Sequence, residues 1–104
     1  MDFNHFLTSY MPDPNIGSKV HFQNMIDQAV LAEKLGYKTV SIPEHHLINL
    51  LMMPSPLQMA VKIATLTKEI SITTGIAVLP LHDMRTYAGE VATADILTEG
   101  RLIL

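Results

Sequence analysis

The chain has 104 residues, enough for one domain with one hydrophobic core, and 48% of them are hydrophobic while 16% are charged. This composition is too apolar for a disordered chain, and a net charge of −3 without a Lys/Arg cluster argues against nucleic acid and anionic membranes as partners. Cysteine is absent, which excludes disulfides and thiolate chemistry. No signal-like or membrane-spanning segment is visible, so a soluble cytoplasmic protein is expected.

The first predicted elements are a short strand and a helix. Residues 3–7 predict the strand, and a loop rich in Pro, Gly and Asn follows it. Between about residues 20 and 35, apolar side chains recur at three- and four-residue spacing, which predicts an amphipathic helix. Ser18 is the expected N-cap of this helix, and Gly36 the residue just past its end.

A second strand and a second helix follow. Residues 37–42 predict the strand, which a proline ends. The sequence SPLQ then predicts a helix start with Ser55 as the N-cap, Pro56 at the first helical position and Gln58 completing a capping box. We expect this helix to continue to about Lys68.

The stretch ISITTGIAVLP, residues 70–80, predicts a third strand because it is rich in β-branched residues. Its apolar residues fall on both alternating faces, with Ile72 and Val78 on one and Ala77 and Leu79 on the other. A strand that is apolar on both faces is typical of a parallel sheet with helices outside.

A third helix is expected over about residues 85–97, and RLIL at the end of the chain begins a fourth strand. The order is therefore βαβαβαβ. Repeated βα units predict an α/β fold with a parallel sheet and right-handed crossovers. We expect residues 1–104 to form a single α/β domain or a half-barrel that stops inside its fourth strand.

Titratable residues cluster where the second strand ends. In parallel α/β folds, ligand and catalytic residues collect at the C-terminal ends of strands, and Glu44, His45 and His46 lie at such an end. Two interpretations stay open: polar loop residues bonded to backbone, or a general acid/base histidine. A metal site is disfavoured, because adjacent histidines on an extended segment point apart and no carboxylate stands at ligand spacing.

The segment LPLHDMR after the third strand is a second candidate. Asp83 is expected to cap the third helix, while His82 or Arg85 contacting a ligand is the alternative. Glycine-rich phosphate motifs are absent. Met52 and Met53 either line an apolar pocket or fill the core.

Four segments carry a resemblance over nearly the whole chain: AEKLGYKTVSIPEHHL, PSPLQMAVKIATLT, ISITTGIAVLPLHDMRTYAGEVATADIL and GRLIL. Together they resemble the N-terminal part of the bacterial luciferase-like, flavin-dependent monooxygenases. The resemblance implies a (β/α)₈ barrel, of which residues 1–104 would form the N-terminal half, because a full barrel needs about 250 residues. It also implies reduced FMN at the C-terminal face (a deazaflavin in some members), molecular oxygen and a small organic substrate.

The resemblance also implies roles for particular residues. His45 matches a catalytic histidine of the family, and His46 stands beside it. The family's non-prolyl cis peptide, which supports the flavin ring, matches the Gly75–Ile76 bond, and Glu44 joins these residues as a cofactor contact. The family's phosphate-binding residues lie mostly after the fourth strand, and Met84 stands where many relatives have proline.

Two other functions compete with the monooxygenase. One is a non-catalytic, oligomerising α/β module that keeps the fold without the flavin site, and the other is a metal-dependent hydrolase using His45 and His46. Four strands leave two open edges, which are templates for pairing with another chain. We therefore predict a homo-oligomer in which the fourth strand of one copy pairs with the first strand of another.

Overall fold

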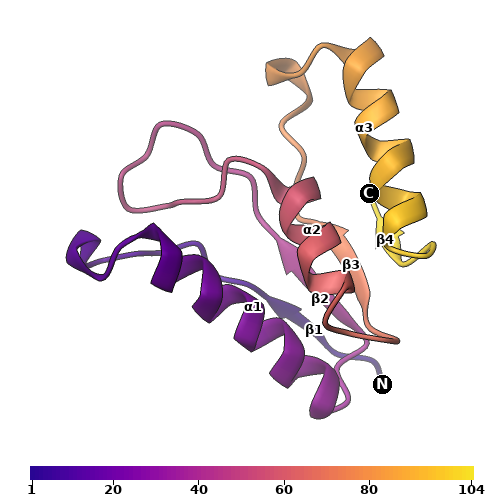
Figure 1. The fold of residues 1–104 in the computed structure, drawn as a ribbon, viewed down its shortest axis with the longest axis horizontal. Coiled ribbons are helices and arrows are strands. Elements are labelled where there is room, and N and C mark those ends of the chain that lie inside the picture. Colours follow the sequence, from indigo (N-terminus) through magenta and orange to yellow (C-terminus); the bar gives the residue numbers. More distant parts are fainter.

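A computed structural model describes all residues from 1 to 104, and it alternates strands and helices in the expected order (Figure 1). The strands form one parallel sheet in the order β1-β2-β3-β4. Two short 3₁₀ turns complete the structure. The elements are β1 (Asn4–Phe6), α1 (Ser18–Lys34), β2 (Thr39–Ile42), α2 (Pro56–Ala64), β3 (Ser71–Thr74), α3 (Met84–Leu97) and β4 (Leu102–Ile103).

One face of the sheet is apolar and covered by helices. Val40 and Ile42 of β2 and Ile72 of β3 are fully buried, and Val40 lies beside Ile72 in the parallel register. Figure 1 shows α1 and α2 crossing in front of the sheet on the same side. Burying one such side chain stabilises a fold by roughly 1.5–3 kcal/mol. The rest of the core comes from Leu7, Met25, Ile26, Ala29, Ala32, Met53, Met59, Ala60, Ile63, Ala64 and Ile70.

The other face of the sheet is largely polar. Successive side chains of a strand point to opposite faces, so Asn4, Ser41 and Thr73 lie opposite the core residues. The Ser41 hydroxyl donates to Asn4 Oδ1 at 3.0 Å. The prediction of apolar residues on both faces of the third strand is therefore wrong, because within β3 only the face with Ile72 is apolar.

The third strand is also shorter than predicted. It ends at Thr74, although the Gly75 N–H still donates to the Ile42 carbonyl at 2.7 Å. The Gly75–Ile76 peptide bond is cis, at the position expected from the sequence. Beyond it the Val78 N–H donates to a side chain instead of to β2. The chain thus leaves the sheet and enters the turn at Leu79–Leu81.

The helix boundaries confirm some of the predicted caps and correct others. Asp83 caps α3 by accepting from the Arg85 N–H at 3.0 Å, and Gly36 follows α1 with a φ of 86°, both as predicted. Ser18 is instead the first residue of α1, after Gly17 at the N-cap. Ser55 occupies the N-cap of α2 without any side-chain cap hydrogen bond.

Helix α2 ends at Ala64 and not at Lys68, because side chains take the carbonyls of its last turn. The Thr67 hydroxyl donates to the Ile63 carbonyl at 2.9 Å, and Arg101 Nη2 donates to the Ala64 carbonyl at 2.8 Å. Side-chain partners of this kind satisfy orphan carbonyls at a helix end. None of the helices is both long and apolar enough to cross a membrane.

Candidate active site

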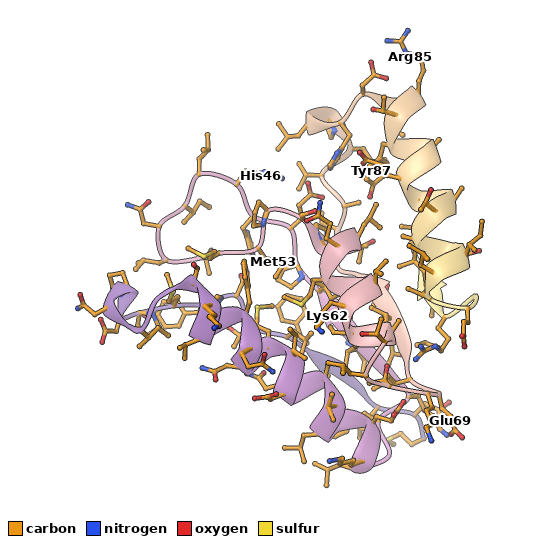
Figure 2. All side chains as sticks on the ribbon, in the orientation of Figure 1. His46, Met53, Lys62, Glu69, Arg85 and Tyr87 are labelled. Atoms are coloured by element: carbon orange, nitrogen blue, oxygen red, sulfur yellow. The ribbon has the colours of Figure 1, made fainter.

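The C-terminal end of β2 carries a buried carboxylate. Ile42 and Pro43 are fully buried, and Glu44 follows them with a side chain that is 0% exposed. Figure 2 shows His46 and Tyr87 toward one end of the molecule and Glu69 at the opposite end. The titratable cluster therefore lies at the end of the sheet where catalytic residues of parallel α/β folds collect.

Three donors converge on the Glu44 carboxylate. Its Oε1 lies 2.6 Å from His46 Nε2 and 2.7 Å from His82 Nε2, and its Oε2 accepts from the Val78 N–H at 2.7 Å. An ionised carboxylate can only accept hydrogen bonds, so both imidazoles must donate an Nε2–H to it. The ring of His82 also stacks on Tyr87, with centroids 4.2 Å apart.

The Glu44 carboxyl is ionised in this environment. Burial acts to raise its pKa, but hydrogen bonds from His46, the Val78 N–H and His82 outweigh burial and hold the pKa below its usual value of 4.5. A carboxylate enclosed in this way is a fixed negative charge at the strand ends.

The two adjacent histidines have different surroundings. His46 is bonded to Glu44, whereas the imidazole of His45 makes no hydrogen bond within the chain. The backbone of His45 is held, since its N–H donates to the Met53 carbonyl at 2.8 Å. Its half-buried ring is thus positioned by the main chain while its nitrogens stay available.

Gly75 follows the end of β3, at the same end of the sheet as these side chains. A Cβ on Gly75 would lie 3.2 Å from Ser41 Cβ and 3.8 Å from the ring of Phe6, so only glycine fits without a shift of its neighbours. Phe6 is 53% exposed and Ile76 is 73% exposed. The bare backbone of Gly75, flanked by these two side chains, suits the face of a planar ring system.

The sequence pointed to Glu44, His45, His46, Gly75 and Ile76, and the structure places all of them at the C-terminal end of the sheet. The closeness of Phe6 to Gly75 was not predicted, and neither was the contact of His82 with Glu44. Only their positions in the sequence could have indicated these contacts, since Phe6 ends β1 and His82 follows β3. No three His, Cys, Asp or Glu side chains are arranged to hold a metal ion.

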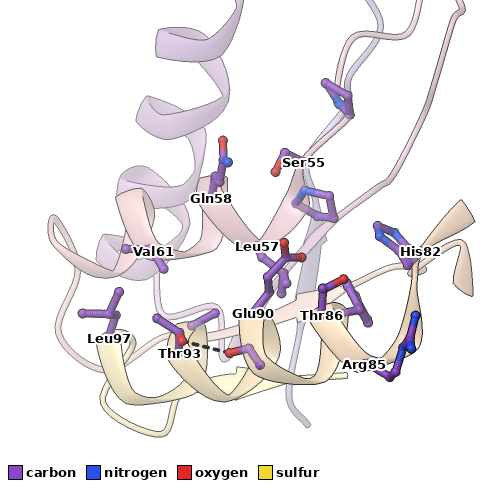
Figure 3. Close-up of a pocket in the computed structure, with 15 residues that line it drawn as sticks. Ser55, Leu57, Gln58, Val61, His82, Arg85, Thr86, Glu90, Thr93 and Leu97 are labelled. Carbon is purple, nitrogen blue, oxygen red and sulfur yellow. Dashed lines mark hydrogen bonds between the residues drawn. The ribbon is translucent and has the colours of Figure 1, made fainter.

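A groove of the chain lies elsewhere, between α2 and α3 (Figure 3). Its volume is about 790 Å³, and His82 and Tyr87 are the residues it shares with the Glu44 cluster. Arg85 at its rim is already paired with Asp83 at 2.7 Å. Because this groove contains neither His45 nor Gly75, we place the candidate site at the strand ends.

Comparison with known proteins agrees with a chain built from the first βα units of a TIM-type barrel. Residues 1–104 match the model of the family described as luciferase-like monooxygenase, and the chain belongs to that family. The uncharacterized protein y4vJ of Sinorhizobium fredii is 35% identical over 104 residues, which are 100% of this chain and 30% of that protein. The oxygenase component of the flavin-dependent trigonelline monooxygenase of Acinetobacter baylyi is 32% identical over 81 residues, 78% of this chain and 22% of that protein.

A solved structure shares the fold closely. The oxygenating constituent of 3,6-diketocamphane monooxygenase from Pseudomonas putida, in complex with FMN, superposes with a TM-score of 0.92 at 25% identity. The match covers 100% of this chain and 28% of that one. The chain therefore spans less than a third of the length of these relatives.

Proposed function

We propose that residues 1–104 carry part of a flavin-dependent monooxygenase site, in which reduced FMN and molecular oxygen oxidise a small organic substrate. The observation that carries the proposal is the bare backbone of Gly75 with Phe6 next to it and the exposed Ile76 after it, at the same end of the sheet as His45. The flavin-dependent relative and the FMN complex of the solved neighbour support the same choice of cofactor. A deazaflavin offers a ring of similar shape and is the second candidate.

Each proposed role follows from the surroundings of the residue. Gly75 and Ile76 would contact the flavin ring, which supplies the electrons that activate oxygen. His45, with a free imidazole, would hold or move a proton near the ring. His46, the next residue, donates a hydrogen bond to the Glu44 carboxylate. Glu44 itself is enclosed, so its proposed contribution to cofactor binding is to hold these neighbours in place.

Titration of FMN fluorescence with the chain tests the proposal. We expect binding with a Kd on the order of 0.1 mM or weaker, because the family's phosphate contacts lie mostly beyond these residues and an unpaired phosphate contributes little affinity. Ile76→Asp should abolish this binding, since it places a charge against the ring. Ile96→Asp is the matched control, because Ile96 on α3 is 75% exposed and Ile76 is 73% exposed.

Three results would count against this site. Micromolar affinity would mean that the chain builds its own phosphate site. Equal weakening by Ile76→Asp and Ile96→Asp would place the flavin elsewhere. No binding at millimolar FMN would favour the alternative function, a non-catalytic oligomerising module.

We also propose that the chain forms a homo-oligomer through its sheet edges. β1 and β4 are the outer strands, and apolar side chains lie exposed beside them: Phe3 is 59% and Ile103 47% exposed. The core side chain Ile72 is already buried within one chain, so the argument for a partner rests on the sheet edges. Light scattering at micromolar concentration should give at least twice 11.5 kDa, and a single-chain mass would contradict pairing of β4 with β1.

A further inference from the structure

We propose that Glu44 is a positioning residue: it orients the imidazoles of His46 and His82, anchors the segment after β3 and leaves His45 as the free imidazole of the pair. The inference deepens the proposed flavin site and rests on it for its functional meaning. The geometric part stands on the contacts of Glu44 alone.

The Glu44 side chain is 0% exposed, and an ionised carboxylate away from water is stable only when hydrogen-bond donors replace its hydration. The three donors come from separate places in the sequence: His46 is two residues away, Val78 is 34 residues away and His82 is 38 residues away. Satisfying this one charge therefore joins the end of β2 to the segment after β3.

Glu44 also anchors the segment proposed to contact the flavin ring. Val78 is two residues beyond Ile76, and its N–H is held at 2.7 Å from Glu44 Oε2. On the other side of Ile76, the Gly75 N–H is held by the Ile42 carbonyl at 2.7 Å. The short segment that presents Ile76 is thus fixed at both ends, and Glu44 supplies one of the two anchors.

The hydrogen bond to Glu44 also makes the two adjacent histidines different. Oε1 of Glu44 takes the Nε2–H of His46, which directs that ring inward and commits one of its nitrogens. His45 is the next residue of an extended segment and points away from His46, with its ring free of hydrogen bonds. Without the carboxylate, no hydrogen bond within the chain would hold the His46 ring in this position.

The cluster around Glu44 also reaches α3. His82 bonds to Glu44 and stacks on Tyr87, which is 4% exposed in the first turn of α3. Burial, followed by the charges of Glu44 and Glu90, raises the pKa of the Tyr87 hydroxyl. One carboxylate therefore ties together the ends of β2 and β3 and the start of α3.

Nitrogen-15 NMR of the histidine rings tests the inference in the chain without flavin. The chain has five histidines, and single His→Gln variants assign their signals. We expect His46 and His82 to show Nε2-bound protons in slow exchange with water, while the His45 ring exchanges fast. Fast exchange at His46 and His82 would overturn the proposal, and so would a protected Nε2–H at His45.

The variant Glu44→Gln adds a second readout, with Glu69→Gln as the control for the same chemical change at an exposed position. Glu44→Gln turns one of the two acceptor oxygens into an NH2 donor, so it should either expose the ring protons of His46 and His82 to exchange or shift the Val78 amide, whereas Glu69→Gln should leave all three unchanged. If Glu44→Gln does not fold, the ring protons of the unaltered chain still decide the matter. Protected signals without any flavin binding would support the positioning role and overturn the proposed flavin function, so the two can fail separately.

Discussion

Under the proposed function, replacing His45 with alanine is expected to slow the single-turnover oxidation of reduced FMN about 100-fold or more, because a positioned acid/base group contributes roughly 10²–10⁴-fold. The effect should be large because no other free imidazole stands beside it: His46 and His82 are both bonded to Glu44. Stopped-flow absorbance of the flavin measures the rate at FMN concentrations above the Kd. Comparison at saturation separates loss of turnover from loss of binding.

His5→Ala is the matched control for this experiment. His5 is also half-buried, but it lies within β1 with its Nε2 3.3 Å from Gln28 Oε1 on α1. Its removal should leave flavin oxidation unchanged. Unaltered oxidation in His45→Ala, or an equal loss in both variants, would exclude His45 as the acid/base residue.

The alternation of strands and helices could be read from the sequence because it depends on local signals. The β-branched residues around Val40 and Ile72 and the regular spacing of apolar residues in α1 both report on burial against a neighbouring layer. Asp83 and Gly36 were predictable for a similar reason, since a cap depends on residues close in sequence.

The ends of elements were harder to predict because distant residues decide them. α2 stops at Ala64 where Arg101, 37 residues later, takes its carbonyl. β3 stops at Thr74. Beyond it, the Val78 N–H donates to the Glu44 side chain and not to β2. Such contacts leave no local pattern, so the β-branched run to residue 80 suggested a longer strand than the one formed.

The location of the candidate site could be predicted from the sequence, but the hydrogen bonds within it could not. The strand-end rule placed Glu44, His45 and His46 together, but it gave no information on which imidazole would face the carboxylate. His82 joins this cluster from 38 residues away, and its partner became apparent only when the two strand ends were seen side by side.

At the opposite end of the sheet, a second carboxylate holds a loop. Glu33, near the end of α1, accepts through Oε2 from three consecutive N–H groups, those of Lys68, Glu69 and Ile70, at 3.0, 2.8 and 2.9 Å. Successive N–H groups directed at one anion form a strong binding site. This contact fixes the entry into β3, because Ile70 directly precedes that strand and is buried in the core.

The variant Glu33→Gln is therefore expected to lower the free energy of unfolding by about 2 kcal/mol. Hydrogen bonds to charged groups contribute roughly 1.5–3 kcal/mol each and neutral ones about 0.5–1.5 kcal/mol, and the variant keeps one neutral acceptor oxygen, so it weakens these bonds without removing all of them. Water can replace the carboxylate at the exposed Lys68 and Glu69, so most of the loss arises at the buried Ile70. Urea unfolding measures the change, which corresponds to a Tm lower by about 10 °C for a domain of this size.

Glu69→Gln is again the matched control, because the Glu69 side chain is exposed and its N–H donates to Glu33 whichever side chain it carries.

The dependence of stability on pH gives an independent check of the role of Glu33. Burial acts to raise the pKa of Glu33, but the N–H groups of Glu69, Ile70 and Lys68, with the charge of Arg101, outweigh burial and hold the pKa below 4.5. A carboxyl whose pKa is lowered on folding contributes stability that is fully present above its unfolded pKa and is lost as the pH falls through the folded value. The unaltered chain should therefore lose stability below about pH 4.5, and Glu33→Gln should lose less over the same range because only the shares due to Glu44 and Asp83 remain. Equal acid sensitivity in the two chains would show that Glu33 does not hold the loop by its charge.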